Sequence, residues 1–281
     1  MQATNTIEAW LKRASDELKA VNVPSAALDA EIILAHTLRK PRTWLHIHGS
    51  EPLNSREWEI ANARLDLRLD RVPVAYIVGH KEFYGRRFKV TTATLIPRPE
   101  TESLIELINE VMPANTSLLE KTERPLRLVD VGTGSGNIGI TAKLQHPQLD
   151  VTLIDTSRHA LNIAEENAAN LQAEVSILQS HLITNFPFSA DIIVANLPYV
   201  NPNWERSPET QHEPSEALFA ENNGLALIFE LLSQTKEKLR SGGSLILEAD
   251  PEQHDSIRKE AARFGLLLVK ISGYGMLFNK I

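Results

Sequence analysis

The sequence of 281 residues contains no cysteine. This absence excludes disulfide bonds, thiolate metal ligands and a cysteine nucleophile. It fits a cytoplasmic protein, which is the location we expect. No apolar run approaches the roughly 18 residues that a membrane-spanning helix requires, and the N-terminal segment lacks the apolar core of a secretory signal. We therefore predict no association with a membrane.

Positive charge is also scarce, because 36 acidic residues outnumber 29 basic ones and the formal net charge is −7. Proteins that bind nucleic acid through its phosphates usually carry a basic face. We therefore expect no direct binding of nucleic acid, and a protein or small-molecule substrate instead. The chain also lacks a Walker phosphate loop and a G-x-S-x-G nucleophile motif. His46 and His48 have no acidic cluster nearby in the sequence, so no metal site is expected.

The first part of the chain has the periodicity of amphipathic helices. The first such helix is indicated by Ile7, Trp10, Leu11, Ala14 and Leu18. Ser25 and Ser55 are predicted to cap two further helices. The polar face of the last helix is expected to be solvated, with Arg64, Asp66, Arg68 and Asp70. Residues 1–80 hold ten acidic and ten basic side chains, so residues 1–78 are predicted to form a neutral helical bundle for docking.

From about residue 125, short apolar strands alternate with helical segments. The strand candidates are LRLVDVG, VTLIDT, VSILQS, ADIIVANLPY, GSLILEAD, LLLVKIS and GMLFNKI. Such alternation predicts an α/β domain with a parallel, doubly wound sheet. Only GYG separates the last two strands, so they should form a hairpin that makes the final strand antiparallel. We expect a β-hairpin linker at 79–100 and the α/β domain at 101–281.

A glycine-rich loop follows the first of these strands in VDVGTGSGNIGI. Gly132, Gly134 and Gly136 would let the backbone turn tightly and approach a ligand closely. Asp155 ends the next strand, where a carboxylate can accept hydrogen bonds from ribose hydroxyls. The G-x-G-x-G spacing favours S-adenosylmethionine. A dinucleotide is an alternative, because Gly134, Gly136 and Gly139 also satisfy G-x-G-x-x-G. A structural tight turn is the third reading.

Asn196-Leu197-Pro198-Tyr199 ends the fourth strand, where ligands bind in doubly wound sheets. It resembles the [N/D]-P-P-[Y/F] motif of methyltransferases that act on a planar nitrogen. Such a nitrogen is a poor nucleophile, since its lone pair is delocalised. The Asn196 oxygen and the Leu197 carbonyl could accept its two N–H groups, Pro198 could fix that carbonyl, and Tyr199 could cover the substrate. The alternative is an Asn-Pro turn with a core tyrosine.

Five segments occur in the order typical of HemK/PrmC-type protein-(glutamine-N5) methyltransferases. They are PVAYIVGHKEFYG, TLIPRPETE, VDVGTGSGNIGI, ANLPYV and HEPSEALFAENNGL. The resemblance covers the chain to about residue 250. It implies a seven-stranded Rossmann-like class I methyltransferase domain, preceded by helices that grip the substrate. It also implies S-adenosylmethionine as the cofactor, and as the target the glutamine of the Gly-Gly-Gln motif in peptide-chain release factors.

The resemblance also implies roles for individual residues. By position, Gly132, Thr133, Gly134, Ser135 and Gly136 would hold the methionine part of the cofactor, Asp155 the ribose, and Leu182 would flank the adenine. Asn196 would adjoin the cofactor and, with Leu197, Pro198 and Tyr199, form the catalytic and substrate-binding tetrapeptide. Glu213, Pro214 and Glu248 match the family as well and are interpreted as structural.

The chain departs from the family pattern at three places: Leu197 replaces the usual proline, His181 replaces an acidic residue, and the C-terminal segment lacks the common Asp and Arg. Asn-Leu-Pro-Tyr is the form found in ribosomal RNA adenine dimethyltransferases. Methylation of an rRNA adenine or of a ribosomal-protein glutamine is therefore the alternative function. An NAD-dependent oxidoreductase and a non-catalytic scaffold are weaker alternatives. We expect a monomer.

Overall fold

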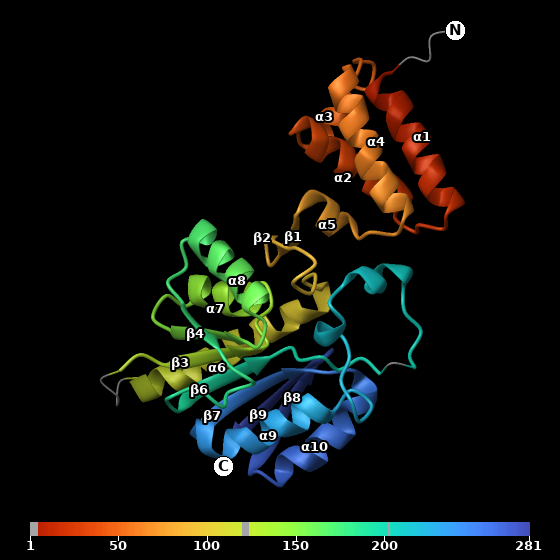
Figure 1. The fold of residues 1–281 in the computed structure, drawn as a ribbon. Helices are drawn as coiled ribbons and strands as arrows, with labels where there is room; N and C mark the ends of the chain where they lie inside the picture. The colour runs from red at the N-terminus through yellow and green to blue at the C-terminus, as the bar shows by residue number, and fades with distance from the viewer. Residues whose placement is uncertain (1–4, 120–123, 202) are drawn as a thin grey trace. The chain divides into compact units, whose positions relative to one another are not determined.

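The computed structural model describes three stretches of the chain, residues 5–119, 124–201 and 203–281. The chain divides into two compact units (Figure 1). The first contains the chain up to His80 together with Ser207–His212, and the second contains Lys81–Arg206 and Glu213–Ile281. No sequence pattern indicates that residues 207–212 belong to the first unit. In the described ranges, no helix is both long and apolar enough to cross a bilayer.

The first unit is helical. Its helices are α1 (Ile7–Ala20), α2 (Ala26–Leu38), α3 (Arg42–Ile47), α4 (Ser55–Leu69) and α5 (Val74–Val78). The predicted apolar face of α1 is confirmed, because Trp10, Ala14 and Leu18 are completely buried. These side chains pack with Ile33 and Leu65 in a core that belongs to this unit alone.

Two local predictions for these helices are wrong. Asn54, and not Ser55, caps α4, because its side chain accepts a hydrogen bond from the Glu57 backbone while the Glu57 carboxylate accepts one from the Asn54 backbone. Ser25 occupies the N-cap position of α2, as predicted, although its side chain makes no capping hydrogen bond. The polar face of α4 is not uniformly solvated either: Arg68 is only 4% exposed.

Arg68 is buried because it is paired with carboxylates. Its guanidinium donates to Asp29 Oδ2 at 2.7 Å and to Glu209 Oε1 at 2.9 Å. Arg71 donates to the second oxygen of Glu209 at 3.0 Å. Burial opposes ionisation of Glu209, but the hydrogen bonds from the arginines outweigh it and lower the pKa of Glu209 to about 2. Glu209 thereby joins the 207–212 segment to the helical unit.

A two-stranded sheet of β1 (His80–Phe83) and β2 (Arg86–Lys89) follows, and all of it except His80 belongs to the second unit. Its α-helices and remaining strands are, in chain order, α6 (Glu102–Leu119), β3 (Arg127–Val131), α7 (Asn137–Gln145), β4 (Asp150–Asp155), α8 (Arg158–Leu171), β5 (Ser176–Gln179), β6 (Ala190–Ala195), α9 (Ala226–Lys238), β7 (Leu239–Glu248), α10 (His254–Ala262), β8 (Leu266–Ser272) and β9 (Gly275–Lys280). All the strand candidates from the sequence pattern are confirmed.

The large sheet has seven strands in the order β5-β4-β3-β6-β7-β9-β8. Its strands pair in parallel except β9, which runs antiparallel to both β7 and β8. The predicted mixed sheet and its terminal hairpin are therefore confirmed. The two strands of this hairpin are joined through Gly273 and Tyr274, and Gly273 has a φ of 59°.

Helices cover both faces of this sheet (Figure 1). Leu128 of β3 belongs to the core shared with α6, α7 and α8. Its neighbour Val129 belongs to the core shared with α9 and α10. Alternate residues of a strand point to opposite faces, which is why a doubly covered strand is apolar throughout. The chain leaves β3 for β4 on one side and later returns to β6 on the other, so a crevice is expected at their carboxyl ends.

Candidate functional site

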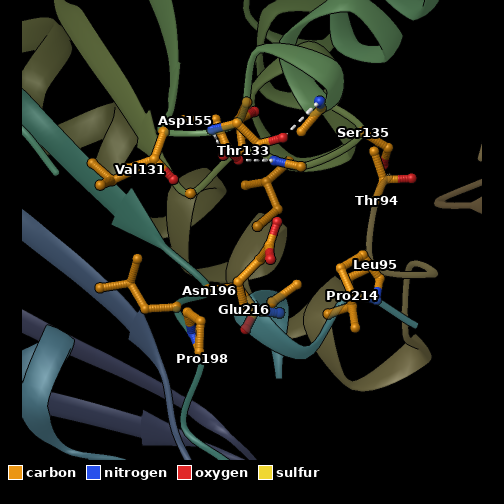
Figure 2. A pocket seen from close by; sticks show the side chains of 18 of the residues that line it. Thr94, Leu95, Val131, Thr133, Ser135, Asp155, Asn196, Pro198, Pro214 and Glu216 are labelled. Carbon is orange, nitrogen blue, oxygen red and sulfur yellow. Dashed lines mark hydrogen bonds between the residues drawn. The ribbon is translucent and has the colours of Figure 1, made fainter. Parts of the chain in front are cut away.

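A cavity lies at the carboxyl ends of β3, β4 and β6, where the strand order reverses, and it is formed by the second unit alone. One side consists of the β3–α7 loop, the residues after β4 and Asn196–Pro198 after β6. Figure 2 shows Thr94, Leu95 and Pro214 on the opposite side, and Arg98 and Glu216 also line the cavity. A cavity is therefore present at the place where the sequence predicts the ligand site.

The β3–α7 loop adopts the left-handed backbone that its glycines permit. The φ angles of Gly132, Gly134 and Gly136 are 69°, 55° and 82°. A Cβ at Gly132 would lie 3.0 Å from Leu197 Cδ2, so this glycine lets the loop pack against the tetrapeptide. A Cβ at Gly134 would meet nothing within 4 Å, because this glycine faces open space. The loop therefore leaves room for a ligand at Gly134.

Asp130, which the sequence analysis missed, fixes the shape of this loop. It is completely buried in β3, and its Oδ2 accepts hydrogen bonds from Thr133 Oγ1 at 2.7 Å and from the Gly139 backbone at 2.9 Å. Burial raises the pKa of Asp130 to about 6. A lone carboxylate inside an apolar strand, directly before a glycine loop, was the sequence signal for this residue.

Asp155 lies at the end of β4 and lines the cavity, as predicted. Its two carboxylate oxygens accept backbone hydrogen bonds from Gly134 and Ser157, each at 2.9 Å. Burial raises the pKa of Asp155, and the carboxylate of Glu216 raises it further. Because each oxygen has a second acceptor site, Asp155 can hold the loop and still accept hydroxyl groups from a ligand.

Asn196, Leu197 and Pro198 line the cavity where β6 ends. The Asn196 amide donates from Nδ2 to Thr101 Oγ1 at 3.1 Å. Tyr199 is not among the lining residues; its hydroxyl donates to Glu248 Oε1 at 3.0 Å. Burial, followed by the neighbouring Glu248 carboxylate, raises the pKa of Tyr199, so the phenol stays protonated.

Glu213 anchors the opposite wall. Glu213 is 7% exposed, and its Oε2 accepts a hydrogen bond from the Ile96 backbone N–H at 3.1 Å. Its other oxygen forms an ion pair with Arg98. These contacts join the proline-rich segment before α6 to the segment that carries Pro214 and Glu216. The predicted structural role of Glu213 thus has a definite form: it ties two strips of the cavity wall together.

Leu182 and His181 line the cavity beyond Asp155. Leu182 is 5% exposed and has a φ of 46°. The His181 ring makes a contact of 2.8 Å between Nε2 and Glu230 Oε1. Among the predicted cofactor residues, Gly136 does not line the cavity. Its position is instead the N-cap of α7, where a Cβ would lie 2.6 Å from Ile140 Cδ1.

The charge of the cavity distinguishes between the two cofactors that the sequence left open. Asp155 and Glu216 both line it, and the carboxylate of Glu216 raises the pKa of Asp155. A ligand with positive charge relieves this repulsion, whereas a pyrophosphate would add to it. The open space at Gly134, the Asp155 acceptors and this charge fit S-adenosylmethionine, which carries a sulfonium and an ammonium group.

Comparison with known proteins gives matches to both the helical part and the α/β part of the chain. Residues 9–79 match the PrmC N-terminal domain and residues 109–213 match the methyltransferase small domain. Two relatives are both named release factor glutamine methyltransferase. The one from Koribacter versatilis is 37% identical over 88% of this chain and 89% of its own length. The one from Escherichia coli is 33% identical over 89% of this chain and 88% of its own.

Among solved structures, the hMettl16 catalytic domain in complex with MAT2A 3'UTR hairpin 6 is similar to this chain, with a TM-score of 0.51 and 15% identity. The similarity covers 77% of this chain and 81% of that one. At this identity the likeness concerns the fold alone. It agrees with the seven-stranded sheet described above.

Proposed function

Because the chain belongs to the family of release factor glutamine methyltransferases, we propose that it methylates the side-chain amide nitrogen of a release-factor glutamine, the one in the Gly-Gly-Gln motif. S-adenosylmethionine is the cofactor of this methyltransferase family. We further propose that the enzyme acts in the cytoplasm as a monomer.

The cofactor would be held by the residues that line the cavity around β3 and β4. The Gly132–Ser135 backbone would accommodate its methionine part, Asp155 would accept the ribose hydroxyls, and Leu182 would contact the adenine. When bound, the cofactor supplies an electrophilic methyl group on a positively charged sulfur. Asp155 and Glu216 would favour that positive charge over a neutral ligand of the same shape.

The substrate amide would be held by the tetrapeptide after β6. Asn196 Oδ1 would accept one N–H of the glutamine amide, and the Leu197 carbonyl would accept the other. Pro198 restricts the chain that carries this carbonyl. Amide resonance, reflected in a rotation barrier of about 18–20 kcal/mol, makes the nitrogen a poor nucleophile. Fixing both N–H groups directs the nitrogen toward the methyl group, and orientation of this kind is worth up to about 7–11 kcal/mol.

Leu197 is compatible with this role although the family usually has proline there. Its side chain is 4% exposed and would be the nearest contact of a Cβ placed at Gly132, at 3.0 Å. The side chain therefore packs against the glycine loop, while the function we propose requires only the backbone carbonyl. The observation that supports the proposal most directly is the contact between Leu197 of the tetrapeptide and the glycine loop at Gly132. Both line the same cavity, and the chain belongs to this family.

The first experiment is methyl transfer from radiolabelled S-adenosylmethionine to a purified release factor. We expect label on the intact factor and none on a factor whose Gly-Gly-Gln glutamine is replaced by alanine. Ribosomal RNA and ribosomal proteins are tested alongside as competing substrates. Label on RNA or on a ribosomal protein, and not on the release factor, would contradict the proposal. Loss of transfer with intact cofactor binding would support a non-catalytic scaffold.

A matched pair of variants tests the role of Asn196. Asn196→Ala should abolish detectable transfer, because one acceptor for the substrate amide is lost, while cofactor binding measured by calorimetry stays within a few-fold. Asn203→Ala changes an exposed asparagine outside the cavity and should transfer at the rate of the unmodified enzyme. Equal rates for the two variants would exclude the role assigned to Asn196.

A further inference from the structure

We infer that Glu248 and Thr101 are positioning residues that set the orientation of the Asn196 amide, so that its oxygen and not its nitrogen faces the substrate. This inference rests on the proposed function of Asn196. Glu248 does not line the cavity, and the family resemblance assigns it no more than a structural part.

The terminal amide of an asparagine side chain can adopt two orientations in this site. Rotation of the terminal amide by half a turn exchanges an acceptor oxygen for a donor nitrogen at nearly the same place. Only one orientation allows Asn196 to accept the N–H of a substrate amide; the other sets two N–H groups against each other. In the structure, Asn196 Nδ2 donates to Thr101 Oγ1 at 3.1 Å, which leaves Oδ1 for the cavity.

Thr101 alone does not decide the orientation, because a hydroxyl both donates and accepts. Thr101 would favour the correct orientation only if its own proton were engaged elsewhere. It is 2% exposed in the short 3-10 turn before α6, so little of its surface reaches the water of the cavity that it lines. The proton of Thr101 therefore needs a buried acceptor.

Glu248 supplies that acceptor. It ends β7 and is 1% exposed. Its Oε1 accepts the Tyr199 hydroxyl at 3.0 Å, and its Oε2 is buried without a hydrogen-bond partner among the described residues. Burial raises the pKa of Glu248, and the neighbouring side chains of Thr101, Tyr199 and Asn196, each of which can donate to an ionised carboxylate, act in the opposite direction.

An ionised carboxylate only accepts, so it determines the direction of every hydrogen bond that reaches it. Thr101 would turn its proton toward the unpartnered Oε2 of Glu248, its oxygen accepts from Asn196 Nδ2, and Asn196 Oδ1 would be directed to the substrate. The same carboxylate tethers the Tyr199 hydroxyl. Because Thr101 and Glu248 are buried, reversing one of these bonds would leave a polar atom of theirs unsatisfied.

The test uses a pair of variants at each position. Thr101→Val removes the hydroxyl at nearly constant shape, whereas Thr101→Ser retains it. Glu248→Gln replaces one acceptor by a donor. We expect single-turnover transfer to fall about tenfold or more in Thr101→Val and Glu248→Gln, because a misdirected amide costs orientation. Thr101→Ser should stay within about threefold of the unmodified enzyme, and cofactor affinity should change little in every variant.

A second readout does not depend on the substrate. In protein labelled with ¹⁵N-asparagine, the Asn196 side-chain amide should exchange its hydrogens slowly with solvent in the unmodified enzyme and in Thr101→Ser. Exchange should be faster in Thr101→Val and Glu248→Gln. Wild-type rates of exchange and transfer in these folded variants would overturn the inference. If the unmodified enzyme labels no release factor while the exchange pattern holds, the proposed function fails and the positioning network stands.

Discussion

At the scale of single residues, Asp130 couples the stability of the fold to pH. Its folded-state pKa of about 6 lies above the ordinary value of 3.8 because the carboxyl is completely buried. Protonation therefore favours the folded state. This contribution is complete below pH 3.8 and is lost as the pH rises through 6, which corresponds to about 3 kcal/mol.

Asp130→Asn isolates this effect, since asparagine keeps an acceptor oxygen and does not titrate. We expect the free energy of unfolding of the unmodified protein to fall by about 2.4 kcal/mol relative to Asp130→Asn between pH 4 and pH 7. Urea unfolding followed by circular dichroism at several pH values measures this difference, in which the titration of other groups cancels. Parallel curves for the two proteins would show that Asp130 does not titrate in this range.

At the scale of secondary-structure elements, Arg68 joins α4 to α2 and to the 207–212 segment through Asp29 and Glu209. Arg68→Met should lower the free energy of unfolding of the helical unit by about 3–5 kcal/mol, because Asp29 is then left buried without its counter-ion. Tryptophan fluorescence in a denaturant titration measures the loss.

Two further variants separate charge pairing from packing in this prediction. Arg56→Met alters an exposed arginine of the same helix and should change stability by no more than about 0.5 kcal/mol. The double variant Arg68→Met/Asp29→Leu removes both buried charges and should recover most of the loss. A double variant as unstable as Arg68→Met alone would mean that the size and shape of the arginine, and not its charge, stabilise the unit.

At the scale of the whole molecule, the two units have separate hydrophobic cores. The cavity belongs to the second unit, so a ligand there should stabilise that unit alone. At a concentration 100 times its dissociation constant, S-adenosylmethionine should add about 2.7 kcal/mol to the stability of the second unit. Two resolved unfolding transitions are expected, and only one should move when the cofactor is added.

The distribution of tryptophans makes this prediction measurable. Trp10, Trp44 and Trp58 lie in the first unit, and Trp204 is the single tryptophan of the second. In a Trp204→Phe variant, fluorescence reports the helical unit, whereas circular dichroism reports both. The midpoint of the fluorescence transition should stay constant when the cofactor is added. The circular dichroism transition that fluorescence does not report, which belongs to the second unit, should shift. Equal shifts by both probes would show that the two units unfold together.

Much of the site could be predicted from local sequence, because each of these residues lies at or just after the end of a strand. Gly132 comes after β3, Asp155 ends β4 and Asn196 comes after β6, and the carboxyl ends of neighbouring parallel strands share one edge of the sheet. The capping of α4 was misread for an equally local reason: Asn54 and Ser55 are adjacent, and both residue types favour the position.

The sequence by itself therefore determined the alternation of strands and helices, the position of the glycine loop and the chemistry at the strand ends. Hydrophobic periodicity and glycine placement act over a few residues, so they are visible in the order of the letters. Only the tertiary structure decided which buried polar groups meet. Thr101 is separated from Asn196 by 95 positions, and Arg68 from Glu209 by 141. A hydrogen bond in the interior depends on how the whole chain folds back, and nothing in a threonine or an arginine alone specifies its distant partner.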